Sequence, residues 1–278
     1  MKKMIVLIVV TCLYLAAACG EIGKVSPLHQ ANAGRRDGRE PAYQLDETSS
    51  GERFALEDGT LLAYYSCQTL RLSVSHPEEM SDEDRRQAER NAESFNQMME
   101  QLMEQAAEGG EKLGESARAA YDQGFRGTAF TDVTTASGTI CGLIVSVRVD
   151  NSGYSGGAHG NGYTDGYLFD LSVGRFIEPI QIADDPEGFR LGAAELLIKK
   201  AEEDEQKKLE YWSDYQSILS RWNEGTVLFD DQGMTVVYSY YELGPYAMGP
   251  VEFFLSYDEI RDLLGPGGLD HLGMAEGA

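Results

Sequence analysis

The spacing of apolar residues between Ala88 and Ala106 is the feature of this sequence that most constrains its fold. Six apolar residues recur there at every third or fourth position: Ala88, Ala92, Phe95, Met99, Leu102 and Ala106. This period places them on one face of an α-helix, whose other faces carry mostly Glu, Gln, Arg and Asn. Ser81 opens a capping-box pattern and predicts where the helix begins. Gly109 and Gly110 weaken the pattern, so we expect an irregular continuation beyond them.

Segments typical of β-strands surround this helix. They cover residues 61–74, 125–135, 139–150, 163–171, 226–229, 234–241 and 251–255. Further helices are predicted after Asp185 and after Ser256, which both stand in helix-start patterns. A short helix at 212–222 carries Trp212 and Trp222, and we expect both to pack into a core. Because hairpins dominate over strand–helix alternation, the predicted fold class is α+β: two small domains of antiparallel sheet packed with helices.

The N-terminus carries the pattern of a bacterial lipoprotein signal. Two lysines precede an apolar run, residues 4–18, which is shorter than the roughly 20 residues that a membrane-spanning helix needs. Three alanines stand directly before Cys19 and resemble a lipobox. On that resemblance residues 1–18 are removed and Cys19 is lipidated, while an ordinary signal peptide cleaved nearby is the alternative. We therefore expect a lipid anchor on the extracytoplasmic face of the cell membrane, followed by a flexible tether over residues 19–54.

The charge of the chain is strongly acidic. It has 46 Asp and Glu against 23 Lys and Arg, a formal net charge of −23. Such a surface repels nucleic acid, because affinity for nucleic acid comes from Lys and Arg that neutralise phosphates. It attracts cationic partners, although charge of this kind also serves solubility alone.

Two cysteines fall in the predicted strands, Cys67 and Cys141. A disulfide between them is chemically permitted outside the cytoplasm. Two buried free thiols are the other interpretation, because the sequence does not give the distance between the two residues.

Two glycine-rich segments interrupt the strand pattern: "SGGAHGNGY" at 155–163 and "GPYAMGP" at 244–250. Glycine permits backbone conformations closed to other residues, and proline stiffens a loop. Tyr246 is a rigid aromatic anchor of the kind that binding hot spots favour. The two segments either pack against each other or contact a partner, or do both.

His159 stands in no metal-binding or catalytic motif. Neither an HxxxH nor an HExxH pattern occurs, and the histidines are far apart in the sequence. Ser155 precedes His159 closely, but the GxSxG arrangement of a nucleophilic serine is missing. We therefore predict no metal, no cofactor and a non-enzymatic protein. A cell-wall-modifying hydrolase that uses His159 and nearby carboxylates is the alternative, and an inert spacer is a third possibility.

A family resemblance follows from several separated motifs in order. "SGGAHGNGYTDGYLFDL" and, after a helix, "DDQGMTVVYSYYELGPYAMGPVEFFLSYDEIRDLL" resemble the C-terminal extracytoplasmic domain of lysozyme-sensing anti-sigma factors of the RsiV type. The preceding segment resembles, by pattern, the companion domain found there and in the peptidoglycan deacetylase PdaC. The resemblance implies a PdaC-like domain at 55–150, an RsiV-type domain at 151–264 and a tail at 265–278. Only three residues precede the apolar run and no deacetylase pattern follows, so we expect neither sigma-factor control nor deacetylation.

The resemblance also implies a partner and a contact surface. RsiV-like ectodomains bind lysozyme, a cationic enzyme, which suits an acidic chain. The residues implied as first contacts are Pro245 and Tyr246, with Ser155, His159 and Tyr163 next. The leading hypothesis is a surface-anchored, non-enzymatic binding lipoprotein of the bacterial cell envelope. Its ligand would be a cationic envelope-active protein such as lysozyme, or peptidoglycan.

Overall fold

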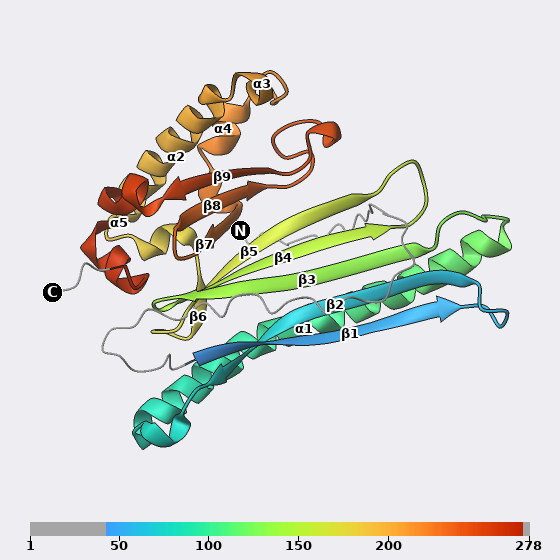
Figure 1. Ribbon diagram of the computed structural model, residues 1–278, viewed down its shortest axis with the longest axis horizontal. Coiled ribbons are helices and arrows are strands. Elements are labelled where there is room, and N and C mark those ends of the chain that lie inside the picture. The colour runs from blue at the N-terminus through green and yellow to red at the C-terminus, as the bar shows by residue number, and fades with distance from the viewer. Residues whose placement is uncertain (1–42, 275–278) are drawn as a thin grey trace, which may run out of the picture.

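The computed structural model describes residues 43–274, which form two β-sheets and five α-helices (Figure 1). The larger sheet has the strand order β1 (Tyr43–Ala55), β2 (Leu61–Val74), β3 (Phe130–Cys141), β4 (Ile144–Tyr154), β5 (Asn161–Asp170) and β6 (Arg175–Ile177). The smaller sheet has the order β7 (Thr226–Phe229), β8 (Gly233–Tyr238) and β9 (Val251–Ser256). Neighbouring strands are antiparallel except β2 and β3, which are parallel. The α+β fold class is confirmed.

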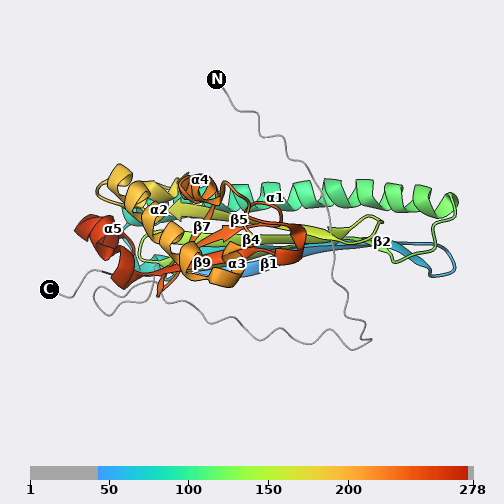
Figure 2. The ribbon, with the colours of Figure 1, turned by 90° about the horizontal axis from the view of Figure 1, so that it is seen from above.

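Helix α1 (Asp82–Asp122) covers one face of the larger sheet and extends along its length (Figure 2). It is the crossover that a parallel β2–β3 pair requires. The Ser81 hydroxyl accepts a hydrogen bond from the Asp84 amide, so the helix begins where the sequence predicts. The helix is continuous through its glycines, and at Gly110 and Gly114 aromatic rings of the sheet pack where a side chain would be. A Cβ atom at Gly110 would overlap the ring of Tyr65.

The remaining helices pack around the smaller sheet. They are α2 (Pro186–Glu203), α3 (Glu205–Lys208), α4 (Tyr215–Leu219) and α5 (Tyr257–His271), with short 3₁₀ helices η2 (Pro179–Ile182), η3 (Trp222–Glu224) and η4 (Tyr246–Met248). A further 3₁₀ helix, η1 (Pro77–Glu79), lies between β2 and α1. Phe189 and Trp222 form the centre of this core with ring centroids 5.2 Å apart. Ile144 and Leu168 of the larger sheet belong to the same core, so the two sheets share it.

Two hydrogen bonds between a side-chain hydroxyl and a backbone group join the sheets. The Ser146 hydroxyl on β4 accepts a hydrogen bond of 2.9 Å from the Phe229 amide on β7. The Thr226 hydroxyl donates to the carbonyl of Thr164 on β5 over 2.7 Å. These bonds satisfy polar groups that would otherwise be buried without a partner.

The predicted tether ends earlier than expected. Residues 43–54 form most of β1, which pairs with β2 along its whole length. This segment is poor in large apolar residues because β1 is an edge strand with much of its surface exposed, and the backbone ladder holds it in place. Residues 1–42, including the predicted signal and Cys19, lie outside the described part of the chain.

The turn between β3 and β4 was predicted in the wrong place. The predicted strands 125–135 and 139–150 place the connection at 136–138, but the strands turn at Gly142 and Leu143. Gly142 has φ +57°, which a tight turn requires. Gly138 lies inside β3 instead, where a Cβ atom would come within 2.7 Å of Leu70 Cδ1. Its missing side chain makes room for a neighbour rather than a turn.

Two predictions about the C-terminal half were wrong, that a tail begins at residue 265 and that Trp212 packs in a core. The first stretch of α5 breaks at Gly265, with φ +73°, which agrees with the predicted helix end at Leu264, but a second helical stretch then continues to His271. Leu272, in the predicted tail, is only 2% exposed. Trp212 was expected in a core, but it is 39% exposed. The predicted domain boundary between residues 150 and 151 falls inside β4.

Within residues 43–274, no helix combines the length and apolar character needed to cross a bilayer.

Candidate functional site

The two glycine-rich segments meet in space. The His159 ring stacks on the Tyr246 ring with centroids 4.3 Å apart and planes inclined by 23°. Tyr240 also stacks on Tyr246, at 4.8 Å and 21°. One face of a ring cannot hold two others at such distances, so His159 and Tyr240 occupy opposite faces of Tyr246. We call His159, Tyr246 and Tyr240 the aromatic stack.

Local backbone geometry shapes both segments. Gly156 and Gly157 adopt φ +94° and +106°, and the Tyr154 hydroxyl donates to the Gly157 carbonyl over 3.1 Å. In the second segment, the Pro245 carbonyl accepts a bond of 2.9 Å from the Met248 amide and starts η4. His159 Nδ1 lies 2.7 Å from the Gly160 carbonyl oxygen, which fixes the ring orientation. Both segments are therefore ordered by their own sequence before any partner binds.

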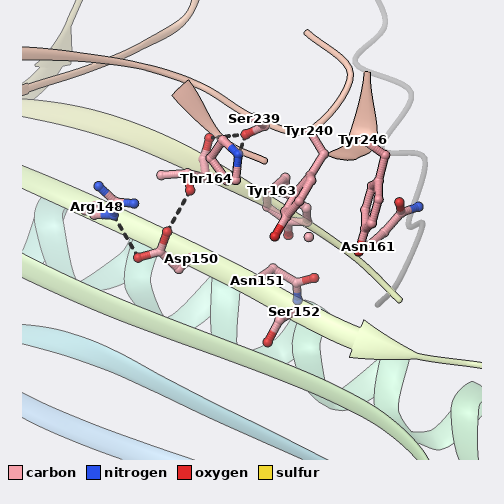
Figure 3. A pocket seen from close by; sticks show the side chains of 12 residues that line it. Arg148, Asp150, Asn151, Ser152, Asn161, Tyr163, Thr164, Ser239, Tyr240 and Tyr246 are labelled. Atoms are coloured by element: carbon pink, nitrogen blue, oxygen red, sulfur yellow. Dashed lines mark hydrogen bonds and ion pairs between the residues drawn. The ribbon is translucent and has the colours of Figure 1, made fainter. Parts of the chain in front are cut away.

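A cavity of about 350 Å³ lies beside the aromatic stack, between β4, β5 and the segment 239–250 (Figure 3). Tyr240 forms one side. The opposite side is polar and includes Arg148, Asp150 and Thr164. The aromatic side and the polar side come from segments about ninety residues apart in the sequence, so no local pattern shows the cavity.

The polar side is held by a continuous set of bonds. Arg148 contacts the carboxylates of Asp150 and Glu252, each over 2.8 Å. The Thr164 hydroxyl donates to the second oxygen of Asp150 over 2.6 Å, and the Thr164 amide donates to Ser239 over 2.8 Å. Burial lowers the pKa of Arg148, but the bonds to the two carboxylates outweigh it and raise that pKa above its usual value. One guanidinium thus bridges two carboxylates, so the positive charge of Arg148 is fully paired within the protein.

The structure brings only some of the five predicted contact residues together. His159 and Tyr246 are in the stack, and Pro245 adjoins it. Ser155 is exposed in the β4–β5 loop. Tyr163 borders the cavity, but side chains alternate along a strand, and the hydroxyl of its neighbour Thr164 bonds to Asp150 on the face of the sheet that Arg148 joins to Glu252 of β9.

Tyr163 therefore projects towards the α1 side of the sheet. Burial, and then the nearby carboxylates of Asp165 and Asp132, raise the pKa of its hydroxyl to about 12.

Sequence reasoning missed an exposed aromatic pair next to the stack, formed by Tyr241 and Trp212. Tyr241 is 52% exposed, and its ring centroid lies 5.6 Å from that of Tyr246. Its φ is +67°, a left-handed conformation that costs a non-glycine residue roughly 1–2 kcal/mol. The Trp212 indole N–H donates to the Tyr241 carbonyl over 3.1 Å. Strained residues of this kind concentrate at functional sites, and positive φ is the signal that the sequence does not show.

The cysteines form no disulfide. Cys67 and Cys141 are both buried free thiols, so the second of the two interpretations holds. Burial raises the pKa of Cys67 to about 11 and that of Cys141 to about 12. Within the described residues, no group of three or more His, Cys, Asp or Glu is arranged to hold a metal ion.

Comparison with known proteins places this fold among proteins of unknown function. Residues 190–258 match the family described as "Protein of unknown function (DUF3298)". No curated protein matches the chain. A member of the DUF3298 family from Bacteroides fragilis has a similar structure, with a TM-score of 0.57 and 17% identity over 87% of this chain and 98% of that one.

A DUF3298 family protein from Pseudomonas aeruginosa is also similar, with a TM-score of 0.50 and 15% identity over 82% of this chain and 97% of that one. The closer likeness to RsiV-type ectodomains stays a prediction. The chain has the fold of solved DUF3298 proteins, and the segment that carries Tyr240 and Tyr246 matches that family in sequence.

Proposed function

We propose that the protein is a non-enzymatic binding lipoprotein on the extracytoplasmic face of the bacterial cell membrane, and that it captures a cationic envelope-active protein such as lysozyme. The observation that carries this proposal is the stack of His159 on Tyr246, because it joins two loops into one surface. Predicted lipidation of Cys19 supplies the anchor.

The surface around the stack has the properties of a protein-docking site. The exposed residues there are Ala158, His159, Tyr241 and Ala247. They lie on loops that are held in place by hydrogen bonds within each loop. Rigid aromatic groups on preorganised loops contribute most of the binding energy in many interfaces, because little conformational freedom is lost on contact.

The charge of the molecule suits a basic partner. Acidic residues outnumber basic ones by 46 to 23, so the long-range field attracts a cationic protein and speeds its approach. This contribution is screened by salt, whereas the contacts of Tyr246 are not.

Titration of the protein with a lysozyme tests the proposal by calorimetry. We expect binding that weakens as salt rises from about 0.05 to 0.3 M, and a loss of about tenfold or more for Tyr246→Ala. The matched control is Phe254→Ala, which removes a ring that is 41% exposed on β9 outside the two loops, and it should bind as the unchanged protein does. Absence of heat, or equal affinity in both variants, would contradict the proposal.

One further variant separates this function from the alternative hydrolase. His159→Ala should weaken lysozyme binding, because the ring that supports Tyr246 is lost. If the unchanged protein acts on cell-wall fragments, and a folded His159→Ala variant does not, the hydrolase becomes the better interpretation. Circular dichroism of the variant shows whether it is folded.

A further inference from the structure

We propose that the cavity between Tyr240 and Asp150 binds one pyranose ring of a glycan. This site shares Tyr246 with the proposed docking surface, but it does not depend on capture of a cationic protein, because its ligand would contact Tyr240 and the polar residues of β4 and β5. Its volume of about 350 Å³ is at the lower end of the roughly 300–1,000 Å³ found for small-molecule sites, which suits a ligand of one or two rings.

The aromatic side of the cavity offers a fixed, flat surface. One face of Tyr240 lies on Tyr246, which His159 supports from its other side. Tyr240 itself lies between Tyr246 and the Asp150–Thr164 pair (Figure 3). Its remaining face is therefore turned towards the cavity. The electron-rich face of an aromatic ring packs well on the C–H face of a sugar, and here the stack holds the ring in place beforehand.

The polar side offers donors and acceptors in fixed positions. Arg148, Asp150 and Ser152 alternate along β4 and share the face of the strand that borders the cavity. A sugar hydroxyl both donates and accepts, so it can bond to a guanidinium and a carboxylate at once. Because two carboxylates, Asp150 and Glu252, already neutralise Arg148, the cavity suits a hydroxyl-rich ligand better than an anion.

Gly162 keeps the space below Tyr240 open. A Cβ atom at this position would lie 2.6 Å from the Asn151 carbonyl oxygen and 3.6 Å from Tyr240 Cε2. Any side chain on Gly162 would therefore push against the β4 backbone and fill the base of the cavity.

The test uses two trisaccharides as probes, N-acetylglucosamine trimer and cellotriose, measured by saturation-transfer NMR and calorimetry. Both have β-1,4 linkages, and only the first carries acetamide groups. We expect binding of at least one of them. Tyr240→Ala should weaken it about tenfold or more, Tyr240→Phe should stay within about threefold because the ring remains, and Phe254→Ala should have no effect.

The pattern of binding identifies the source of the sugar, and it separates this proposal from the function proposed above. Preference for the amino-sugar trimer supports a peptidoglycan-type glycan, and equal binding supports recognition of the pyranose ring alone. Failure of both probes to bind, or a folded Tyr240→Ala variant that binds normally, overturns the site. A protein that binds a trisaccharide but no lysozyme contradicts only the function proposed above.

Discussion

Single carboxylates between α1 and the larger sheet carry an electrostatic cost. Asp132 and Asp165 project to this side of β3 and β5, and burial raises the pKa of both. The Asn151 amide donates to Asp132 over 2.7 Å and Tyr167 bonds to Asp165, which lowers each pKa only in part. A raised carboxyl pKa means that the folded protein binds protons more readily than the unfolded chain does.

Asp165→Asn tests this cost. With a raised folded-state pKa, the native state holds more protons than the unfolded state between the two pKa values, so the free energy of unfolding falls as pH rises through that interval. The variant should therefore be more stable than the unchanged protein at pH 7, and the difference should shrink as the pH falls towards the pKa of free aspartate, about 3.9. Urea unfolding at both pH values measures it.

The control for that experiment has the opposite sign. The Thr60 amide donates to exposed Asp58 over 2.9 Å, which lowers the pKa of Asp58. Asp58→Asn should lose whatever stability this bond contributes at neutral pH, and it should lose none in acid. A shift of the same sign in both variants would rule out burial as the cause.

At the scale of elements, the glycines of α1 record how closely the helix approaches the sheet. Gly110 and Gly114 are buried against the rings of Tyr65 and Phe54. Gly109 is next to them in sequence, but its nearest neighbour is Asp132 Oδ2, at 3.8 Å from where a Cβ atom would lie. Of these two adjacent residues, Gly109 therefore has space for a methyl group and Gly110 has none.

Alanine at each position provides a matched pair. Gly109→Ala should raise the free energy of unfolding by about 0.5–1 kcal/mol, because alanine favours helix over glycine and there is room for its methyl group. Gly110→Ala has the same intrinsic gain, but it should lower the stability, since the methyl group displaces the Tyr65 ring. Thermal unfolding compares the two. Stabilisation by both changes would show that α1 does not lie as described.

The elements that the sequence predicts well are those with strong local signals. The bounds of β2 and β7 agree with the prediction, because their β-branched and aromatic runs end at turn residues. The start of α1 agrees because Ser81 caps it. β1 was missed because an exposed edge strand has no apolar alternation, and Gly138 was misread because a glycine that makes room for a neighbour looks like a turn.

The candidate site was predictable only in its parts. Glycine, proline and Tyr246 marked each loop separately. The stacking of His159 on Tyr246 joins positions far apart in the chain, and no pattern in one sequence encodes that contact. Tyr240 and Asp150 looked like ordinary strand residues, and only the packing of the smaller sheet against β5 brings them to one cavity.

At the scale of the whole molecule, the two predicted domains share a core. Ile144 and Leu168 of the larger sheet pack with Trp222 and its neighbours in the smaller unit. His271, on the last helix, contacts Asp170 at the end of β5 over 3.1 Å. Neither unit can lose its structure without exposing apolar surface of the other.

We therefore expect residues 43–274 to unfold in one cooperative step. Tryptophan fluorescence reports on the smaller unit, because Trp212 and Trp222 both lie there, whereas far-ultraviolet circular dichroism reports largely on α1. The two probes should give the same midpoint in urea. Two separate midpoints would show that the units are independent domains.

The parallel pairing of β2 with β3 also sets an order of events during synthesis. One edge of β2 can pair with β1 as soon as both are made, but its other edge has no partner until residues 130–135 emerge, after the whole of α1. A nascent chain of intermediate length thus displays an open, partly apolar strand edge, which invites contact with other chains. Ribosome stalling or truncation before residue 130 should accordingly yield the most aggregation-prone form of this protein.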